Sequence, residues 1–99
     1  MADTTSPAGL GARRLAFAAL EETLRVRRAL DDVLAVQAPK AALDARDLGL
    51  ARAIAVTGLR RLGTIRRALA ERLEKPMRDP RVEALLVAGA AQILFLDVP

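Results

Sequence analysis

The stretch VEALLVAGAAQILFL, residues 82–96, decides the fold class of this chain. Only Glu83 and Gln92 are strongly polar in it, and they project on opposite sides of a helix. A helix that is apolar all round is normally buried. Fifteen residues at about 1.5 Å each span roughly 22 Å, which is short of the ~30 Å hydrocarbon core of a membrane. We therefore predict that this stretch is the central helix of a soluble bundle, with the rest of the chain as its cover.

Four further helices are expected before this stretch, which makes the fold class all-α, a bundle of about five helices. Apolar residues recur at helical spacing, and they place these helices at about residues 12–25, 29–36, 45–61 and 64–73. Pro39 is expected to stop the second helix, Asp44 to cap the third, and Gly63 to separate the third from the fourth. Asp79 and Pro80 are typical of the start of a last helix. The third helix carries a stripe of small residues, which predicts a close approach to the helix at residues 82–96.

Length and composition suit one small domain with an apolar core, because 53% of the 99 residues are hydrophobic. Pro7, Gly9 and Gly11 delay regular structure, so residues 1–11 are predicted to be a flexible lead-in to a helical domain at residues 12–99. The sequence contains no cysteine or histidine, which excludes disulfides, zinc clusters, thiol nucleophiles and imidazole bases within it. Its start has neither the basic segment nor the apolar run of a signal peptide, so a cytoplasmic protein is expected.

Positive charge is concentrated in the second half of the chain. The net charge is +4, and residues 51–99 carry nine basic against five acidic side chains. Fourteen of the sixteen basic residues are arginine, whose planar guanidinium group can hold a phosphate through two hydrogen bonds. A sequence rich in arginine and alanine also arises from GC-rich coding. Basic charge alone is therefore weak evidence for nucleic-acid binding.

No pattern in these residues predicts catalysis. Gly9-Leu10-Gly11 is only a fragment of a cofactor-binding loop, without a preceding strand or a third glycine at the required spacing. The acidic pairs at residues 21–22 and 31–32 are adjacent, so on a helix their carboxylates point about 100° apart instead of converging on one substrate. We interpret both pairs as solvated surface.

Several stretches of the chain resemble one family. LDARD at residues 43–47, Ala51-Arg52 and Gly58-Leu59-Arg60 resemble the middle of NusB-like domains. VAGAAQILFLDVP, residues 87–99, looks like the stretch that these domains carry in the RsmB/Sun/Fmu family of bacterial rRNA cytosine-C5 methyltransferases. ARRLAFAAL, residues 12–20, is similar to the arginine-bearing first helix of the same domains. The chain is thus identified by resemblance as an N-terminal NusB-like domain of this family.

The resemblance implies an RNA-binding domain that positions rRNA for a methyltransferase domain outside this chain. S-adenosylmethionine and the cysteine nucleophiles belong to that catalytic domain, so these 99 residues are expected to be no enzyme and to hold no cofactor. In that family further helices follow the closing proline. We therefore expect a domain truncated after Pro99, and self-association through apolar surface left on the helix at residues 82–96.

Two other functions stay open at this point. A NusB-type transcription antitermination factor would bind RNA and a protein partner without any catalytic domain. A helical interaction module would bind protein and have no role with RNA. The native reading frame beyond Pro99 and RNA binding at low salt distinguish the three hypotheses.

Six arginines are candidates for holding the phosphate backbone of rRNA: Arg13, Arg14, Arg60, Arg61, Arg66 and Arg67. Arg13 and Arg14 match the arginine pair of the family's first helix, where backbone amides and arginine together can hold phosphate. A plain solvated helix start is the alternative. Arg60 and Arg61 have a structural reason in the dipole of the helix that they end. Arg66 and Arg67 continue the basic strip, and the sequence leaves open whether these groups converge.

The expected mode of binding follows from the aromatic residues. The sequence has no Trp or Tyr, and Phe17 and Phe95 are both expected to be buried. Unpaired bases would then find no aromatic surface on which to stack. Contacts should be mainly to phosphate, which makes binding weak, sensitive to salt and poorly selective for sequence.

Overall fold

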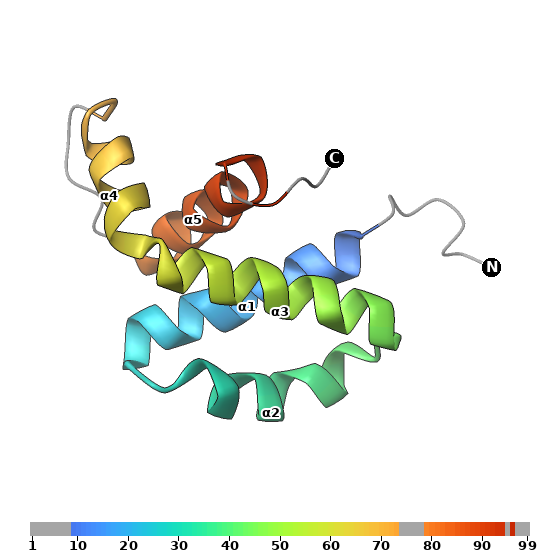
Figure 1. Cartoon of the computed structure of the whole chain (residues 1–99). Coiled ribbons are helices and arrows are strands. Elements are labelled where there is room, and N and C mark those ends of the chain that lie inside the picture. Colours follow the sequence, from blue (N-terminus) through green and yellow to red (C-terminus); the bar gives the residue numbers. More distant parts are fainter. Residues whose placement is uncertain (1–8, 74–78, 95, 97–99) are drawn as a thin grey trace.

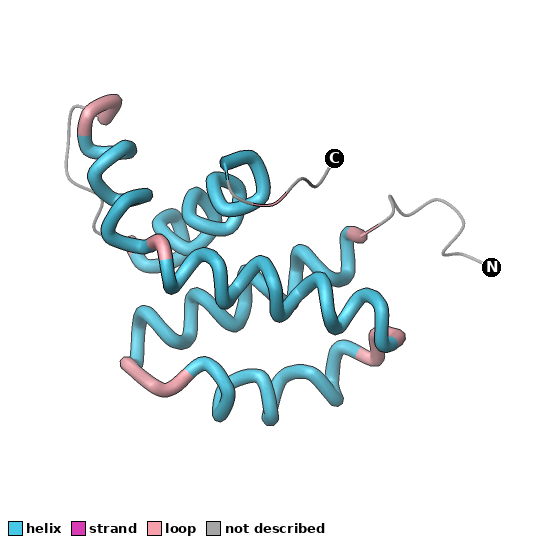
Figure 2. The backbone as a smooth tube through the Cα atoms, in the orientation of Figure 1, coloured by secondary structure: helices cyan, strands magenta, loops and turns pink. Residues whose placement is uncertain are grey.

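The chain folds into five helices, as the computed structural model shows (Figures 1 and 2). The structure describes residues 9–73, 79–94 and 96. The helices are α1 (Leu10–Val26), α2 (Leu30–Ala41), α3 (Ala45–Arg60), α4 (Leu62–Ala70) and α5 (Pro80–Leu94). All regular structure in the described residues is helical, which confirms the predicted all-α class. Phe95 and Pro99 lie outside the described residues, as does most of the predicted lead-in.

Aspartate caps begin two of the helices as predicted. Asp44 precedes α3, and its Oδ1 accepts a hydrogen bond of 2.8 Å from the backbone N–H of Asp47. Asp79 precedes α5, and its Oδ1 accepts a hydrogen bond of 2.9 Å from the backbone N–H of Arg81. Each cap satisfies an N–H group that has no partner inside its helix.

Two predicted helix ends are wrong. Pro39 lies inside α2 instead of stopping it, because a proline removes one hydrogen bond and crowds only the preceding turn, and α2 ends soon afterwards at Ala41. Gly63 lies inside α4, and the break between α3 and α4 falls at Arg61, where φ is −103° and ψ is 14°. Glycine costs a helix only about 1 kcal/mol relative to alanine. Ile65, which is buried in the core, holds the first turn of α4 in place despite this cost.

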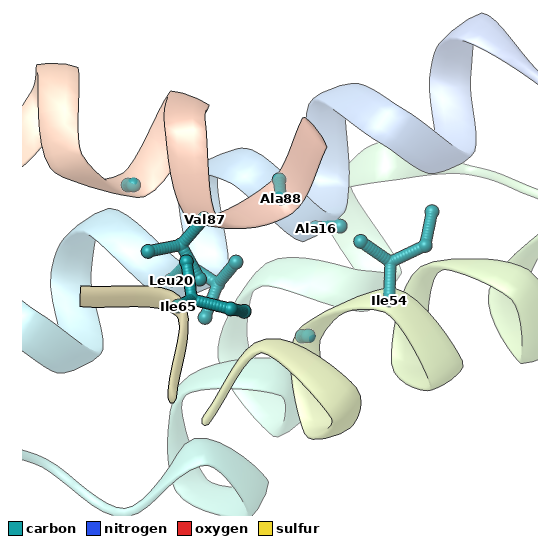
Figure 3. Close-up of a cluster of buried hydrophobic side chains, with 8 residues drawn as sticks. Ala16, Leu20, Ile54, Ile65, Val87 and Ala88 are labelled. Carbon is teal, nitrogen blue, oxygen red and sulfur yellow. The ribbon is translucent and has the colours of Figure 1, made fainter. Parts of the chain in front are cut away.

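Helices α1 and α3 form the middle of the bundle. They contact each other, and both contact α2 on one side and α5 on the other, while α2 and α5 do not meet (Figure 1). Two groups of buried side chains follow from this arrangement. The first lies between α1, α2 and α3 and includes Leu15, Val33 and Ala51. The second lies between α1, α3, α4 and α5 and includes Leu20, Ile54, Ile65 and Val87, which Figure 3 shows together with Ala16 and Ala88.

At Gly58, α3 lies close to both α1 and α5. A Cβ atom at this position would lie 2.9 Å from Val87 Cγ1 and 3.4 Å from Leu20 Cδ1. Glycine is therefore the residue that lets α3 pack against α1 and α5 without displacing either side chain. The predicted close approach to α5 is thus confirmed at Gly58, whereas Ala51 of the same stripe packs among α1 and α2 residues.

Helix α5 is buried on one face only. Ala84, Val87, Ala88 and Ala91 point into the core, whereas Val82, Leu85, Ile93 and Leu94 are 46%, 61%, 82% and 58% exposed. The prediction that this helix is covered on all sides is therefore wrong, because among the described residues only α1, α3 and α4 pack against it. No helix in the described part of the chain is long and apolar enough to cross a membrane.

Candidate nucleic-acid interface

Arg13 joins α1 to α5 and is not a free arginine. Its Nε donates a hydrogen bond of 2.7 Å to Gln92 Oε1, and Gln92 Nε2 donates one of 3.0 Å to the carbonyl oxygen of Ala88. The guanidinium group also lies over Gly9, since a Cβ atom there would be 2.6 Å from Arg13 Nη1. Gly9 has a φ of +80°, which glycine adopts without strain. The side chain of Arg13 thus has a packing role at the start of the bundle.

Arg14 is exposed and points to another side of α1. Successive residues of a helix project about 100° apart, and here Arg13 faces α5 while Arg14 lines a groove beside α2. The structure records no hydrogen bond or ion pair for Arg14 within the described residues. The two arginines that open α1 therefore do not form one group, and only Arg14 has an uncommitted guanidinium.

Arg66 is held by Glu83, which ties α4 to α5. Arg66 Nε lies 2.8 Å from Glu83 Oε2, and Arg66 Nη2 lies 2.9 Å from Glu83 Oε1. Both nitrogens donate, so the pair has the parallel geometry that suits guanidinium and carboxylate. The hydrogen bonds to Glu83 raise the pKa of Arg66 above its ordinary value, against a smaller lowering by burial. The charge of Arg66 is therefore largely matched inside the protein.

Arg60, Arg61 and Arg67 lie at the junction of α3 and α4. Arg60 and Arg67 are exposed, and the structure records no hydrogen bond or ion pair for either within the described residues. Arg61 connects the two helices, and its backbone N–H donates a hydrogen bond of 2.9 Å to the carbonyl oxygen of Thr57. Two side chains of the predicted α3–α4 strip, Arg60 and Arg67, are thus available to a ligand.

The junction of α3 and α4 is well separated from the start of α1, since the two lie toward opposite ends of the bundle (Figure 1). Leu50 is the residue of α3 that lies beside the start of α1, because its Cδ2 would be 3.6 Å from a Cβ atom placed on Gly9. Ten helical residues from there to Arg60 correspond to about 15 Å. The predicted arginines therefore form two separate exposed regions, one at Arg14 and one at Arg60 and Arg67.

Three further arginines, Arg25, Arg28 and Arg52, are paired with acidic side chains. Arg25 lies 2.8 Å from Glu21 within α1, which confirms the predicted pair at i and i+4. Arg28 lies 3.8 Å from Glu22. Arg52 lies 2.8 Å from Asp31 and so connects α3 to α2. These pairs leave a smaller basic surface than the number of arginines in the sequence indicates.

A groove of about 410 Å³ runs between α1 and α2 at the end of the bundle that carries Arg14. Leu15, Ala18 and Leu43 supply apolar walls, while Arg14 and Lys40 supply positive charge. Lys40 is exposed and, like Arg14, makes no recorded hydrogen bond or ion pair with the described residues. Sequence reasoning missed Lys40, because a single lysine in the last turn of a helix carries no motif. Only the packing of α2 on α1 brings it to the same groove as Arg14.

The two glycines of the loop fragment at residues 9–11 have structural roles. Gly9 begins α1, and Gly11 allows the close approach of Leu43, whose Cδ2 would lie 2.7 Å from a Cβ on Gly11. The described residues contain no group of three acidic, cysteine or histidine side chains that could hold a metal ion. What the structure offers chemically is arginine and lysine on the surface of a helical bundle.

The fold and this surface define a class of protein, an all-α domain with exposed basic side chains suited to a polyanion. The sequence matches the NusB family over residues 10–99, and the chain belongs to this family. It is 37% identical over 101 residues to the ribosomal RNA small subunit methyltransferase B of Xanthomonas campestris pv. campestris. That alignment covers 100% of this chain and 23% of the relative, so the chain spans about a quarter of the relative's length. No solved structure matches the chain.

Proposed function

We propose that the chain is the RNA-binding N-terminal domain of a bacterial rRNA (cytosine-C5) methyltransferase, acting in the cytoplasm. In this role it holds rRNA in position for a catalytic domain elsewhere in the protein. The observation that carries the proposal is the alignment of the whole chain with a relative named as an rRNA small subunit methyltransferase. The exposed arginines support it, because phosphate contacts fix the position of a nucleic acid without reading its sequence.

The methyl-transfer chemistry is assigned to that other domain. S-adenosylmethionine supplies the methyl group in methyltransferases of this family, and the described residues do not fit it. They contain no strand that leads into a glycine-rich turn, and Gly9 and Gly11 are already engaged in packing. The sequence also has no cysteine to serve as a nucleophile. The role of this chain is therefore binding.

The structure divides the six candidate arginines by their partners. Arg14, Arg60 and Arg67 are the residues proposed to contact phosphate, because their guanidinium groups are exposed and have no recorded partner in the described residues. Arg13 and Arg66 are proposed to act indirectly by holding α5 and α4 in place. Arg61 connects the two helices that carry Arg60 and Arg67.

Fluorescence anisotropy with labelled fragments of small-subunit rRNA tests the proposal over a range of salt concentrations. The chain should bind at low salt and lose affinity as salt rises. Arg14→Ala should reduce the slope of log K against log salt by about one, as expected when one phosphate contact is removed. Arg81→Ala, an exposed arginine on α5 outside the proposed site, is the matched control and should leave the slope unchanged. Absence of binding at low salt would contradict the proposal.

One observation favours a second function. Leu85 and Ile93 are among the exposed apolar side chains of α5, and exposed apolar surface can mark a protein-binding site. It suits a helical interaction module, or a NusB-type antitermination factor that binds both RNA and a protein. The interaction module requires that RNA binding is absent at low salt. The antitermination factor requires a gene that encodes no methyltransferase domain next to these residues.

A further inference from the structure

The groove between α1 and α2 has the size and lining of a small-ligand site. Its volume of about 410 Å³ lies within the range of roughly 300–1,000 Å³ that is typical of such sites. The walls contributed by Leu15, Ala18 and Ala41 are aliphatic. Leu43, from the turn between α2 and α3, also lines the groove and approaches α1 because Gly11 has no side chain.

Both helices contribute a positive charge to this groove. Arg14 comes from α1 and Lys40 from the last turn of α2, and no acidic residue lines the groove among the residues that the structure describes. Glu22, which lies toward the other end of α1, is engaged by Gln37 and Arg28. The Glu22 carboxylate adjoins the end of the groove at Gln37, so an anionic ligand is favoured at the other end, beside the uncommitted Arg14 and Lys40.

Gln37 also lines the groove, and its side-chain amide is held by Glu22. Its Nε2 donates a hydrogen bond of 2.7 Å to Glu22 Oε1, and its buried Oε1 has no hydrogen-bond partner in the part of the chain that the structure describes. A buried acceptor without a donor costs free energy.

We propose that this groove is a subsite for one unpaired nucleotide of single-stranded RNA, an inference that rests on the RNA-binding function proposed above. The base lies against the aliphatic walls, and its phosphate lies between Arg14 and Lys40. A nucleotide combines a flat base, which suits the aliphatic walls, with an adjacent negative charge, which suits Arg14 and Lys40. The aliphatic groove thus takes the place of the aromatic surface that the sequence lacks. A base in a duplex cannot enter, so the site selects unpaired RNA.

The test compares a short single-stranded RNA with an abasic oligonucleotide of the same length, which carries the same phosphates. The wild-type chain should bind the RNA about five-fold more tightly, at the lower end of what stacking of one base on an aromatic side chain provides. Ala18→Leu fills the groove and should abolish this preference without changing the salt slope. Ala35→Leu is the matched control, because Ala35 is exposed on the same α2 and does not line the groove. Lys40→Ala should keep the preference and reduce the salt slope by about 0.7, the contribution of one phosphate contact in a single strand.

The outcomes separate this inference from the proposed function. Equal binding of RNA and abasic oligonucleotide by the wild-type chain overturns the subsite but leaves phosphate binding intact. The subsite is also overturned if Ala18→Leu, with a native circular dichroism spectrum, still prefers RNA to the abasic oligonucleotide. If Ala18→Leu does not fold, Ala41→Leu is the second variant that fills the groove. Displacement of RNA by a leucine-containing acidic peptide at equal concentration reassigns the groove to protein. Absence of any RNA binding refutes the proposed function and the subsite together.

Discussion

Replacing Gly58 with alanine should destabilise this domain, although alanine is the better helix former. The exchange gains about 1 kcal/mol in helix propensity. Against this gain, the new Cβ would lie 2.9 Å from Val87 Cγ1 and 3.4 Å from Leu20 Cδ1, so one of the helices must shift. Val87 is fully buried and β-branched, and it has no alternative rotamer into which to move easily. Overpacking of this kind costs about 1–3 kcal/mol.

The net loss should therefore be about 1 kcal/mol, which lowers Tm by about 4–8 °C in a domain of this size. Urea unfolding followed by far-UV circular dichroism measures it, since the chain has no Trp or Tyr for fluorescence. Gly49→Ala is the matched control in the same helix: its Cβ would meet nothing within 4 Å, so it should stabilise by about 1 kcal/mol. In a double variant, Val87→Ala should remove the penalty of Gly58→Ala. If Gly58→Ala stabilises as much as Gly49→Ala, the close approach of α3 to α5 is refuted.

Three further predictions concern helix α5. Arg13→Ala and Gln92→Ala should each destabilise the domain. A double-mutant cycle should give a coupling energy of about 1–3 kcal/mol, as for a hydrogen bond to a charged group. Additive effects would show that the contact contributes nothing to stability. Glu83→Gln should weaken its exposed pair with Arg66 by up to about 1 kcal/mol, and less at high salt, when unfolding is measured at two ionic strengths; a loss independent of salt would contradict an ionic contribution. The chain should self-associate through α5 in analytical ultracentrifugation, and Ile93→Glu, at a side chain that is 82% exposed, should make it monomeric. A wild-type chain that stays monomeric at every concentration would refute that last prediction.

The buried faces of the helices were predictable because they depend on local spacing. Leu15 and Leu20 lie on the arc of α1 that the 3.6-residue period indicates, and both are buried. The cap at Asp44 was predictable for the same reason, since its partner is only three residues away. The environment of α5 was not, because apolar residues on every side of a helix do not reveal how many neighbours pack against it. Ile93 is an example: it belongs to this apolar stretch, and yet it is 82% exposed.

The candidate site was predictable only in part. Arg14 and Arg67 fall on polar helix faces, and both are exposed. The partners of Arg13 and Arg66 are 79 and 17 residues away in the sequence, and no local pattern pairs an arginine with a distant glutamine or glutamate. Lys40 enters the site through the packing of α2 on α1, which the sequence does not specify at the level of single side chains.

The contact between the first and last helices also sets an order of events during protein synthesis. The core of Leu15, Val33 and Ala51 is complete once α3 has left the ribosome, since α1, α2 and α3 supply all of its buried side chains. Leu20 and Ile54 must wait for α5, which is translated after the other four helices. A nascent chain therefore carries an open apolar face on α1 and α3 until about residue 94 emerges, and it is in this interval that a chaperone would find the domain.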